Sequence, residues 1–235
     1  LPDGITEICQ GVFDNCTSLT SIEIPSSIKR IGRFAFAGCT NLRNVAIPSS
    51  VTEICGGVFI GCKSLTSIKI PTRVKKIGTY AFSECGNLQT IEIPVDVKQI
   101  QAGVFNNCSS LTSIFIHERI ESIAVKSYWD EMEEEFLEGA FEGCSSLQEI
   151  HVHLENKYYS SIDGVLFNKV GNEIIKFPSA HNKKEYTRTA ECIKYNDNII
   201  IGIALGETYE IESKHKIDID YKQRESGPSG GLMMA

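Results

Sequence analysis

The sequence predicts a solenoid, in which short coils of similar sequence stack along one axis. The first observation behind this prediction is a repeat of 23 residues, clearest in the four consecutive blocks that begin at Ile24, Ile47, Ile70 and Ile93. The second is that apolar residues keep fixed places in every block, with a spacing that fits neither one helix nor one long strand. Each coil can then bury its apolar side only against its neighbours, so we expect function on a surface built by repetition and not in a pocket.

Each block predicts two short strands joined by turns. We number block positions from 1 to 23, with Ile24 at position 1; apolar residues recur at positions 1, 5, 8, 13, 19 and 22. Residues 19–24 alternate in their last half and predict a strand that Pro25 ends, because proline cannot donate to a strand ladder. A second strand is expected around residues 51–54, and a helical turn at residues 32–39. Stacked coils would then form two parallel sheets, with strands about 4.8 Å apart.

The repeat pattern I-P-x-x-V-x-x-I-x-x-x-A-F-x-x-C-x-x-L-x-x-I resembles the BspA-type leucine-rich repeat, because six positions recur together. Residues 156–178 look like the hairpin that commonly interrupts these arrays. The resemblance implies a right-handed leucine-rich repeat solenoid of short parallel β-strands and short helical turns, with a β-hairpin segment after the sixth coil. It also implies an extracellular or cell-surface binding module of host-associated bacteria or parasitic protists, which acts in adhesion or protein recognition and has no enzymatic activity.

The chain divides into four expected parts. Residues 1–152 are expected to form the leucine-rich repeat coils, with about thirteen residues inserted in the sixth coil at about 125–137, where the Ala-Phe pair arrives late. Residues 153–189 are expected to form the hairpin interruption, and residues 190–221 a degenerate coil or a different cap. Residues 222–235, rich in glycine and serine, are expected to be a flexible tail.

Charge and composition limit the classes of partner that the chain can bind. The net charge is −7, and the segment 118–149 holds ten acidic residues against two basic ones, so the rest of the chain is close to neutral. Nucleic acid is excluded as a partner because its phosphates need a basic stripe. The sequence has no apolar run long enough to span a bilayer and no signal peptide. Because the chain begins with Leu1 at position 1 of a coil, we expect a processed or excised fragment. The expected location outside the cell rests on the family resemblance alone.

Eight of the nine cysteines follow the repeat. Cys9 and Cys55 share position 9, and the larger group shares position 16: Cys16, Cys39, Cys62, Cys85, Cys108 and Cys144. Residues at one position of adjacent coils have parallel Cα–Cβ vectors, which is poor geometry for a disulfide. Since no CxxC pair is present either, we expect a ladder of buried, reduced thiols and no metal or disulfide role.

Candidate binding residues fall in two regions. The first is the outward side of the strand at positions 21 and 23, which has no core duty, so recognition can be encoded there. Its candidates are Glu23, Lys69, Glu92, Phe115 and His151. The second is the insertion, where Tyr128 and Trp129 lie beside an acidic run, a composition typical of an interaction anchor. The predicted partner is a protein, with a host or cell-surface protein as one option.

Several alternatives stay open at this stage. The insertion could be a solvated excursion, its carboxylates could bind calcium, and His117, His151 and His153 could hold zinc or copper. Asn15 and Asn107 begin glycosylation sequons, although asparagine is expected in such turns for backbone reasons. The array could be a structural spacer in a longer surface protein, or residues 190–235 could carry an enzymatic or regulatory domain. No catalytic motif is present, so we expect no catalytic residue, no metal and no cofactor.

Overall fold

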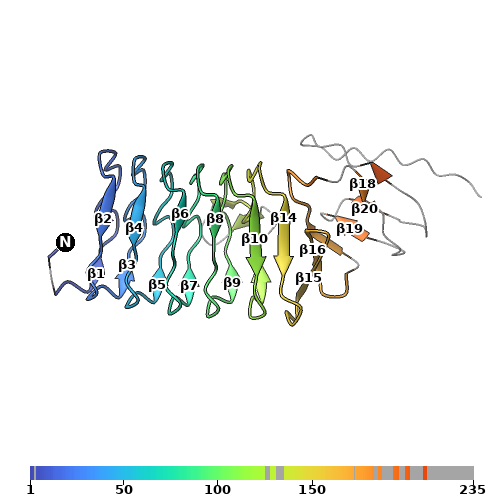
Figure 1. Ribbon diagram of the computed structural model, residues 1–235, viewed down its shortest axis with the longest axis horizontal. Coiled ribbons are helices and arrows are strands. Elements are labelled where there is room, and N and C mark those ends of the chain that lie inside the picture. The colour runs from blue at the N-terminus through green and yellow to red at the C-terminus, as the bar shows by residue number, and fades with distance from the viewer. Residues whose placement is uncertain are drawn as a thin grey trace, which may run out of the picture.

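The computed structural model of the protein describes residues 1–2, 4–124, 128–130, 135–171, 173–182, 185–186, 193–195, 199–201 and 209–210. For residues 128–130 and 135–137, and beyond residue 182, it describes only the backbone. The described coils form an elongated parallel β-solenoid, in which every coil contributes two short strands (Figure 1). This confirms the fold predicted from the 23-residue repeat.

The two rows of strands follow the predicted positions. The first row lies at positions 7 and 8 and consists of β1 (Glu7–Ile8), β3 (Arg30–Ile31), β5 (Glu53–Ile54), β7 (Lys76–Ile77), β9 (Gln99–Ile100) and β11 (Ser122–Ile123). The second row starts at position 21 and consists of β2 (Ser21–Glu23), β4 (Asn44–Ala46), β6 (Ser67–Ile68), β8 (Thr90–Ile91), β10 (Ser113–Ile116) and β14 (Glu149–Val152). All pairs recorded within each row are parallel, so equivalent residues of successive coils lie side by side.

A stack of phenylalanine rings runs through the core. The rings at position 13 are nearly parallel, with centroids 5.2 to 6.1 Å apart. The stack consists of Phe13, Phe36, Phe59, Phe82, Phe105 and Phe141. Around it pack the apolar residues of positions 5, 8 and 19, which are almost fully buried in the inner coils. The core is therefore one continuous column, as expected when each coil is stabilised only by its neighbours.

The expected helical turns are replaced by successive tight turns. The described residues contain no helix. The reason lies in the backbone: positions 11 and 15 adopt left-handed φ values of 55 to 72° in the first five coils. Two such residues, four positions apart, interrupt any helical run. Asn15 and Asn107 occupy position 15, which confirms the backbone role expected for asparagine there.

Position 11 also shows an alternation between neighbouring coils. Glycine occupies it in the first, third and fifth coils, and Phe34 or Tyr80 in the second and fourth. Each aromatic ring lies against the glycine of the following coil: a Cβ added to Gly57 would be 2.3 Å from a ring carbon of Phe34, and one added to Gly103 would be 2.1 Å from Tyr80. The structural repeat is thus closer to two coils than to one in this part of the array.

An antiparallel hairpin follows the sixth coil, as predicted. It consists of β15 (Tyr159–Ile162) and β16 (Val165–Asn168), and β17 (Glu173–Lys176) continues the sheet on the far side of β16. The sheet is extended by β19 (Ile193–Tyr195) and β20 (Ile199–Ile201), while β18 (Glu185–Tyr186) pairs with β21 (Tyr209–Glu210). Most of the cap expected at 190–221, and all of the tail expected at 222–235, lie outside the described residues. No helix in the described part of the chain is long and apolar enough to cross a membrane.

The insertion forms a second hairpin, of β12 (Tyr128–Asp130) and β13 (Glu135–Leu137). The register from β10 to β14 is offset by 36 residues, thirteen more than between other neighbouring coils. Ala140 N donates to Ala124 O, the same bond between positions 12 and 9 that Ala35 and Gly32 form in the second coil. The chain therefore leaves the sixth coil after position 9, forms the inserted hairpin, and re-enters the coil at position 10, where the hydrogen bond of a regular coil is kept.

Candidate protein-binding face

The outward residues of the second strand row form the predicted exposed surface. We call this surface, made of the residues at positions 21 and 23 along β2, β4, β6, β8, β10 and β14, the strand face. The register places Glu23 beside Ala46, and Phe115 beside His151. Lys69 and Glu92 follow β6 and β8 directly and are exposed. All five candidates from this row thus lie on one face of the solenoid.

Phe115 is the most unusual residue of the strand face. In β10 the alternation of the strand buries Ile114 and Ile116 and turns Phe115 outward, where its side chain stays 50% exposed. The ring of His153 stands edge-on to it, with centroids 6.3 Å apart and planes at 85°. An exposed aromatic side chain held by neighbouring rings is a rigid apolar anchor that loses little conformational entropy on binding.

The charges around Phe115 are mixed. His151 Nε2 lies 3.0 Å from Glu149 Oε2, on the strand next to Phe115. Further along the face, Glu23, Lys69 and Glu92 form no ion pair with the described residues. A flat face with both signs of charge and one aromatic group has the composition of a protein-recognition surface, and it lacks the uniform charge that a polyanion requires.

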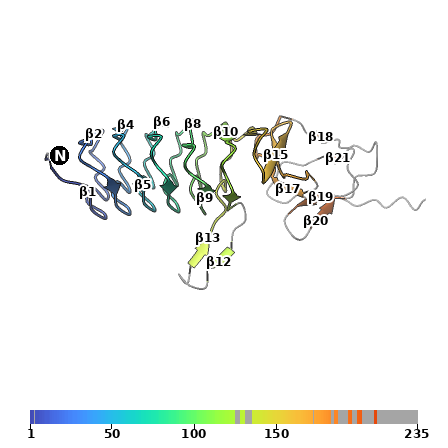
Figure 2. The ribbon, with the colours of Figure 1, turned by 90° about the horizontal axis from the view of Figure 1, so that it is seen from below.

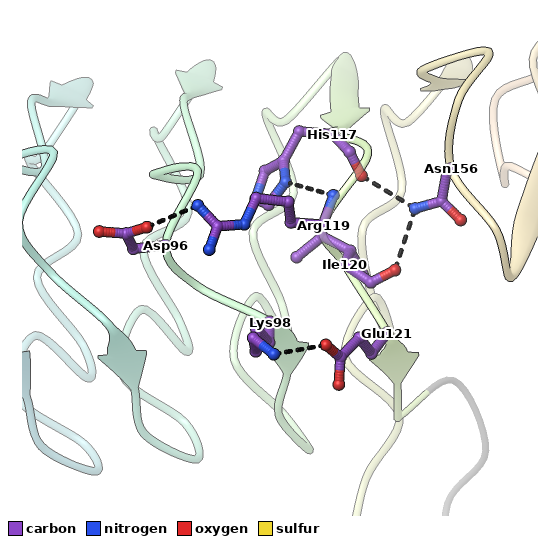
Figure 3. A network of polar contacts seen from close by, with 7 residues as sticks. All are labelled: Asp96, Lys98, His117, Arg119, Ile120, Glu121 and Asn156. Carbon is purple, nitrogen blue, oxygen red and sulfur yellow. Dashed lines mark hydrogen bonds and ion pairs between the residues drawn. The ribbon is translucent and has the colours of Figure 1, made fainter.

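The first strand row differs because its charges pair with one another. Arg30 bridges Glu7 and Glu53, and Lys76 also lies 3.7 Å from Glu53. Just before this row in the later coils, Lys98 bonds Glu121 at 2.6 Å at position 6, and Arg119 bonds Asp96 at 2.9 Å in the turn at position 4 (Figure 3). Such exposed pairs contribute at most about 1 kcal/mol each to stability, but they leave few charges for a partner. The strand face is therefore the better candidate.

The three histidines considered for a metal do not lie in equivalent surroundings. His117 is almost fully buried, and its Nδ1 accepts a hydrogen bond from Arg119 N at 3.2 Å. Burial lowers the pKa of His117, so the ring favours its neutral form. His151 is instead exposed on the strand face. Within the described ranges, no group of three or more His, Cys, Asp or Glu side chains is arranged to hold a metal ion.

Five of the six thiols at position 16 form the predicted buried ladder, whereas Cys16, in the first coil, is only partly buried. Each thiol donates a hydrogen bond to the carbonyl of the phenylalanine one coil earlier, at 3.1 to 3.2 Å; the donors are Cys39, Cys62, Cys85, Cys108 and Cys144. Burial raises the pKa of Cys62 to about 12 and that of Cys144 to about 12. Because the thiolate is the reactive form, these cysteines serve packing and not chemistry.

The insertion lies on another side of the molecule. The hairpin β12–β13 projects from the side of the solenoid opposite the strand face (Figure 2). The side chains of Tyr128 and Trp129 lie outside the described part of the structure. The two candidate regions from the sequence therefore lie on different sides of the solenoid.

A stack of parallel coils with fixed apolar positions defines a leucine-rich repeat protein. The chain matches the model of the BspA type leucine rich repeat region in 6 copies, over residues 6–133 and 134–202. This match covers well over half of the sequence, and the chain belongs to the BspA-type leucine-rich repeat family. No curated protein matches it.

Solved structures of bacterial leucine-rich repeat proteins resemble the chain. A leucine-rich repeat protein of T. pallidum (TpLRR) is 33% identical with a TM-score of 0.55, over 63% of this chain and 64% of that one. A leucine-rich cell surface protein of Faecalibacterium prausnitzii is 28% identical with a TM-score of 0.57, over 77% of this chain and 52% of that one. The pneumococcal vaccine antigen PcpA, 23% identical with a TM-score of 0.56 over 77% of this chain and 44% of that one, shares the fold. The chain thus spans less than two thirds of each of these proteins.

Sequence reasoning missed the edge-on partner of Phe115. His153 drew attention only as a possible metal ligand, because it stands at position 2, where the first complete coils have proline. The spacing in the sequence could have revealed this contact. His153 lies two positions beyond the residue paired with Phe115 on the next coil, so the two side chains come close once the coils stack.

Proposed function

We propose that this chain is a non-enzymatic binding module, displayed on a cell surface or secreted, that recognises a partner protein through its strand face with Phe115 as the central anchor. The observation that carries the proposal is the half-exposed Phe115 ring, at a position where other coils have small or charged residues. Binding energy in protein interfaces concentrates in a few such aromatic residues surrounded by polar ones.

Two further facts support this proposal. One of the similar solved structures is described as a leucine-rich cell surface protein, which fits a location outside the cell. The strand face also keeps charges that form no ion pair with any described residue, including Lys69 and Glu92, and these can add specificity around an apolar anchor. A structural spacer would need neither an exposed aromatic ring nor unpaired charges on the same face.

The experiment places a photo-crosslinking phenylalanine analogue at Phe115 or at Val170, an exposed apolar residue outside the strand face. The full chain is incubated with intact host cells, and crosslinked proteins are identified by mass spectrometry. We expect a discrete partner from position 115 only, and a loss of at least tenfold in its capture by Phe115→Asp but not by Val170→Asp. Identical crosslinks from both positions, or none from either, would favour a spacer.

A further inference from the structure

A buried asparagine replaces the usual apolar residue where the array ends. Position 5 holds isoleucine or valine in the second to sixth coils, and these residues are at most 1% exposed. In the next coil the same position is Asn156, which is 0% exposed. A buried amide is costly unless its hydrogen bonds are made, so this substitution calls for a specific set of partners.

Asn156 has four hydrogen-bond partners, two on each side. Its Nδ2 donates to the carbonyl oxygens of His117 at 2.9 Å and Ile120 at 3.0 Å, both in the preceding coil (Figure 3). Its Oδ1 accepts from the backbone N–H groups of Tyr158 and Tyr159, each at 2.8 Å, at the entry to the hairpin. The side chain thus joins the last turn of the array to the hairpin. In a regular array, the backbone of a further coil would make these bonds instead.

Other backbone groups on the same edge also meet the hairpin. Ile123 N donates to Tyr159 Oη at 3.0 Å, and Val152 N donates to Ser161 Oγ at 3.0 Å. Two more bonds join backbone groups, from Ile150 N to Gly164 O and from Ala180 N to Leu147 O, both at 2.7 Å. The hairpin therefore contacts the last strand of each row, β11 through a side chain and β14 through a side chain and the backbone.

An uncovered edge would be a hazard. A row of free N–H and C=O groups on a parallel sheet is a template for pairing with another chain, and solenoids need a terminal unit that blocks this. The hairpin crosses the edge with antiparallel strands, so no further 23-residue coil can stack directly on β14 in register.

We infer that residues 156–180 are a C-terminal cap that closes the solenoid edge, and that Asn156 is the positioning residue that sets the cap on the array. The segment that resembles an interruption between coils then ends the regular run of coils at β14, and its outer strand β17 pairs with β19. The cap also holds β14, and with it His151, beside β10.

The first test changes Asn156 in the full chain. Asn156→Leu puts an apolar residue of similar size at position 5, as in the other coils, and removes all four hydrogen bonds. Asn156→Asp keeps the two bonds that the side chain accepts and loses the two that it donates. We expect hydrogen exchange at the amides of Ile123 and Val152 to rise at least tenfold in both variants, with oligomers that grow with protein concentration. Amides of the central coils should keep their rates. Unchanged protection in Asn156→Leu would show that the residue only fills space, and would overturn the inference.

A matched pair of serines provides a milder test that preserves the fold. Ser161 Oγ accepts from Val152 N on the array, whereas the adjacent Ser160 Oγ donates to Asn168 O inside the hairpin. We expect Ser161→Ala to speed exchange at the Val152 amide at least tenfold and Ser160→Ala to leave it unchanged. Equal effects of the two variants, or no effect of Ser161→Ala, would show that the hairpin does not seal this edge.

Discussion

Phe59 tests the core at the scale of one residue. Its ring is fully buried between Phe36 and Phe82, with both centroid distances 5.5 Å. Phe59→Ala removes stacking on both sides and leaves a cavity that rigid neighbours cannot fill, so we expect it to lower the free energy of unfolding by about 3 to 5 kcal/mol in urea melts.

The control for that measurement is Lys69→Ala, which lies ten residues further on the exposed strand face of the same coil. It touches no core residue and should change the free energy of unfolding by less than about 0.5 kcal/mol. Equal losses in the two variants would mean that the repeat positions are misassigned.

The buried thiols predict a loss of stability in alkali. In the unfolded chain a cysteine ionises near pH 9, whereas burial raises the pKa of folded Cys62 to about 12. The unfolded state therefore releases its proton first, so the contribution of the Cys62 thiol is complete below pH 9 and disappears as the pH rises from 9 towards 12. This thiol should make the free energy of unfolding fall by about 1.4 kcal/mol per pH unit in this window.

Urea melts between pH 8 and 11 measure this slope. Lysine and tyrosine also titrate in alkali, so the comparison is with Cys62→Ser, which has one ionisable thiol fewer and should show a shallower slope. A slope unaffected by Cys62→Ser would show that this thiol is not shielded in the folded state.

At the scale of the element, the turn at position 11 depends on an aromatic–glycine pair. Gly57 has a left-handed φ of 64°, and an added Cβ would meet the Phe34 ring; Gly61 has a φ of 72°, but its added Cβ would find only ordinary contacts at 3.7 Å. Alanine at either site pays the left-handed strain of roughly 1 to 2 kcal/mol. Gly57→Ala should cost about 1 kcal/mol more, because the Phe34 ring must also move.

A double-mutant cycle isolates that extra cost. In a Phe34→Gly background the ring is absent, so Gly57→Ala and Gly61→Ala should become equally destabilising in thermal or urea melts. An excess that persists without the ring would place the strain in the backbone alone.

The strands were predictable because their signal is local and repeated. Alternation before each proline located β2, β4 and their equivalents, and the constant spacing then fixed which residues share the strand face. The turns were harder to predict from the sequence. Glu84, Phe34 and Tyr80 adopt left-handed φ values that their residue types disfavour, so local preference predicted a helical turn that the stacking of the coils does not allow.

At the scale of the whole molecule, the repeat alone predicted which side chains come together along the array, including Phe115 and His151. It could not show that the insertion projects from the opposite side, because that depends on where in the coil the chain leaves the stack (Figure 2). Nor could it show that Asn156 ends the array, since the partners of a buried amide are backbone groups that carry no sequence signal.

The insertion gives the last prediction, which concerns the molecule as a whole. Deleting residues 125–137 joins Ala124 to Glu138, and the hydrogen bonds from Ala140 N to Ala124 O and from Gly103 N to Glu138 O already have the geometry of a regular coil. We therefore expect the deletion to keep the fold and to leave the melting temperature unchanged or higher, because a shorter loop costs less entropy.

Binding through the strand face should survive this deletion, because the hairpin β12–β13 lies on the opposite side of the solenoid. The measurement is capture of the protein crosslinked at Phe115, by the deletion variant and by the full chain, at low salt and at 0.5 M salt, where screening reduces electrostatic reach to about 4 Å. Capture that is lost on deletion and is also lost at 0.5 M salt would instead assign recognition to the acidic insertion with Trp129. Capture that resists both changes and is abolished by Phe115→Asp would assign recognition to the strand face, since salt screens contacts between charges and does not weaken an apolar anchor.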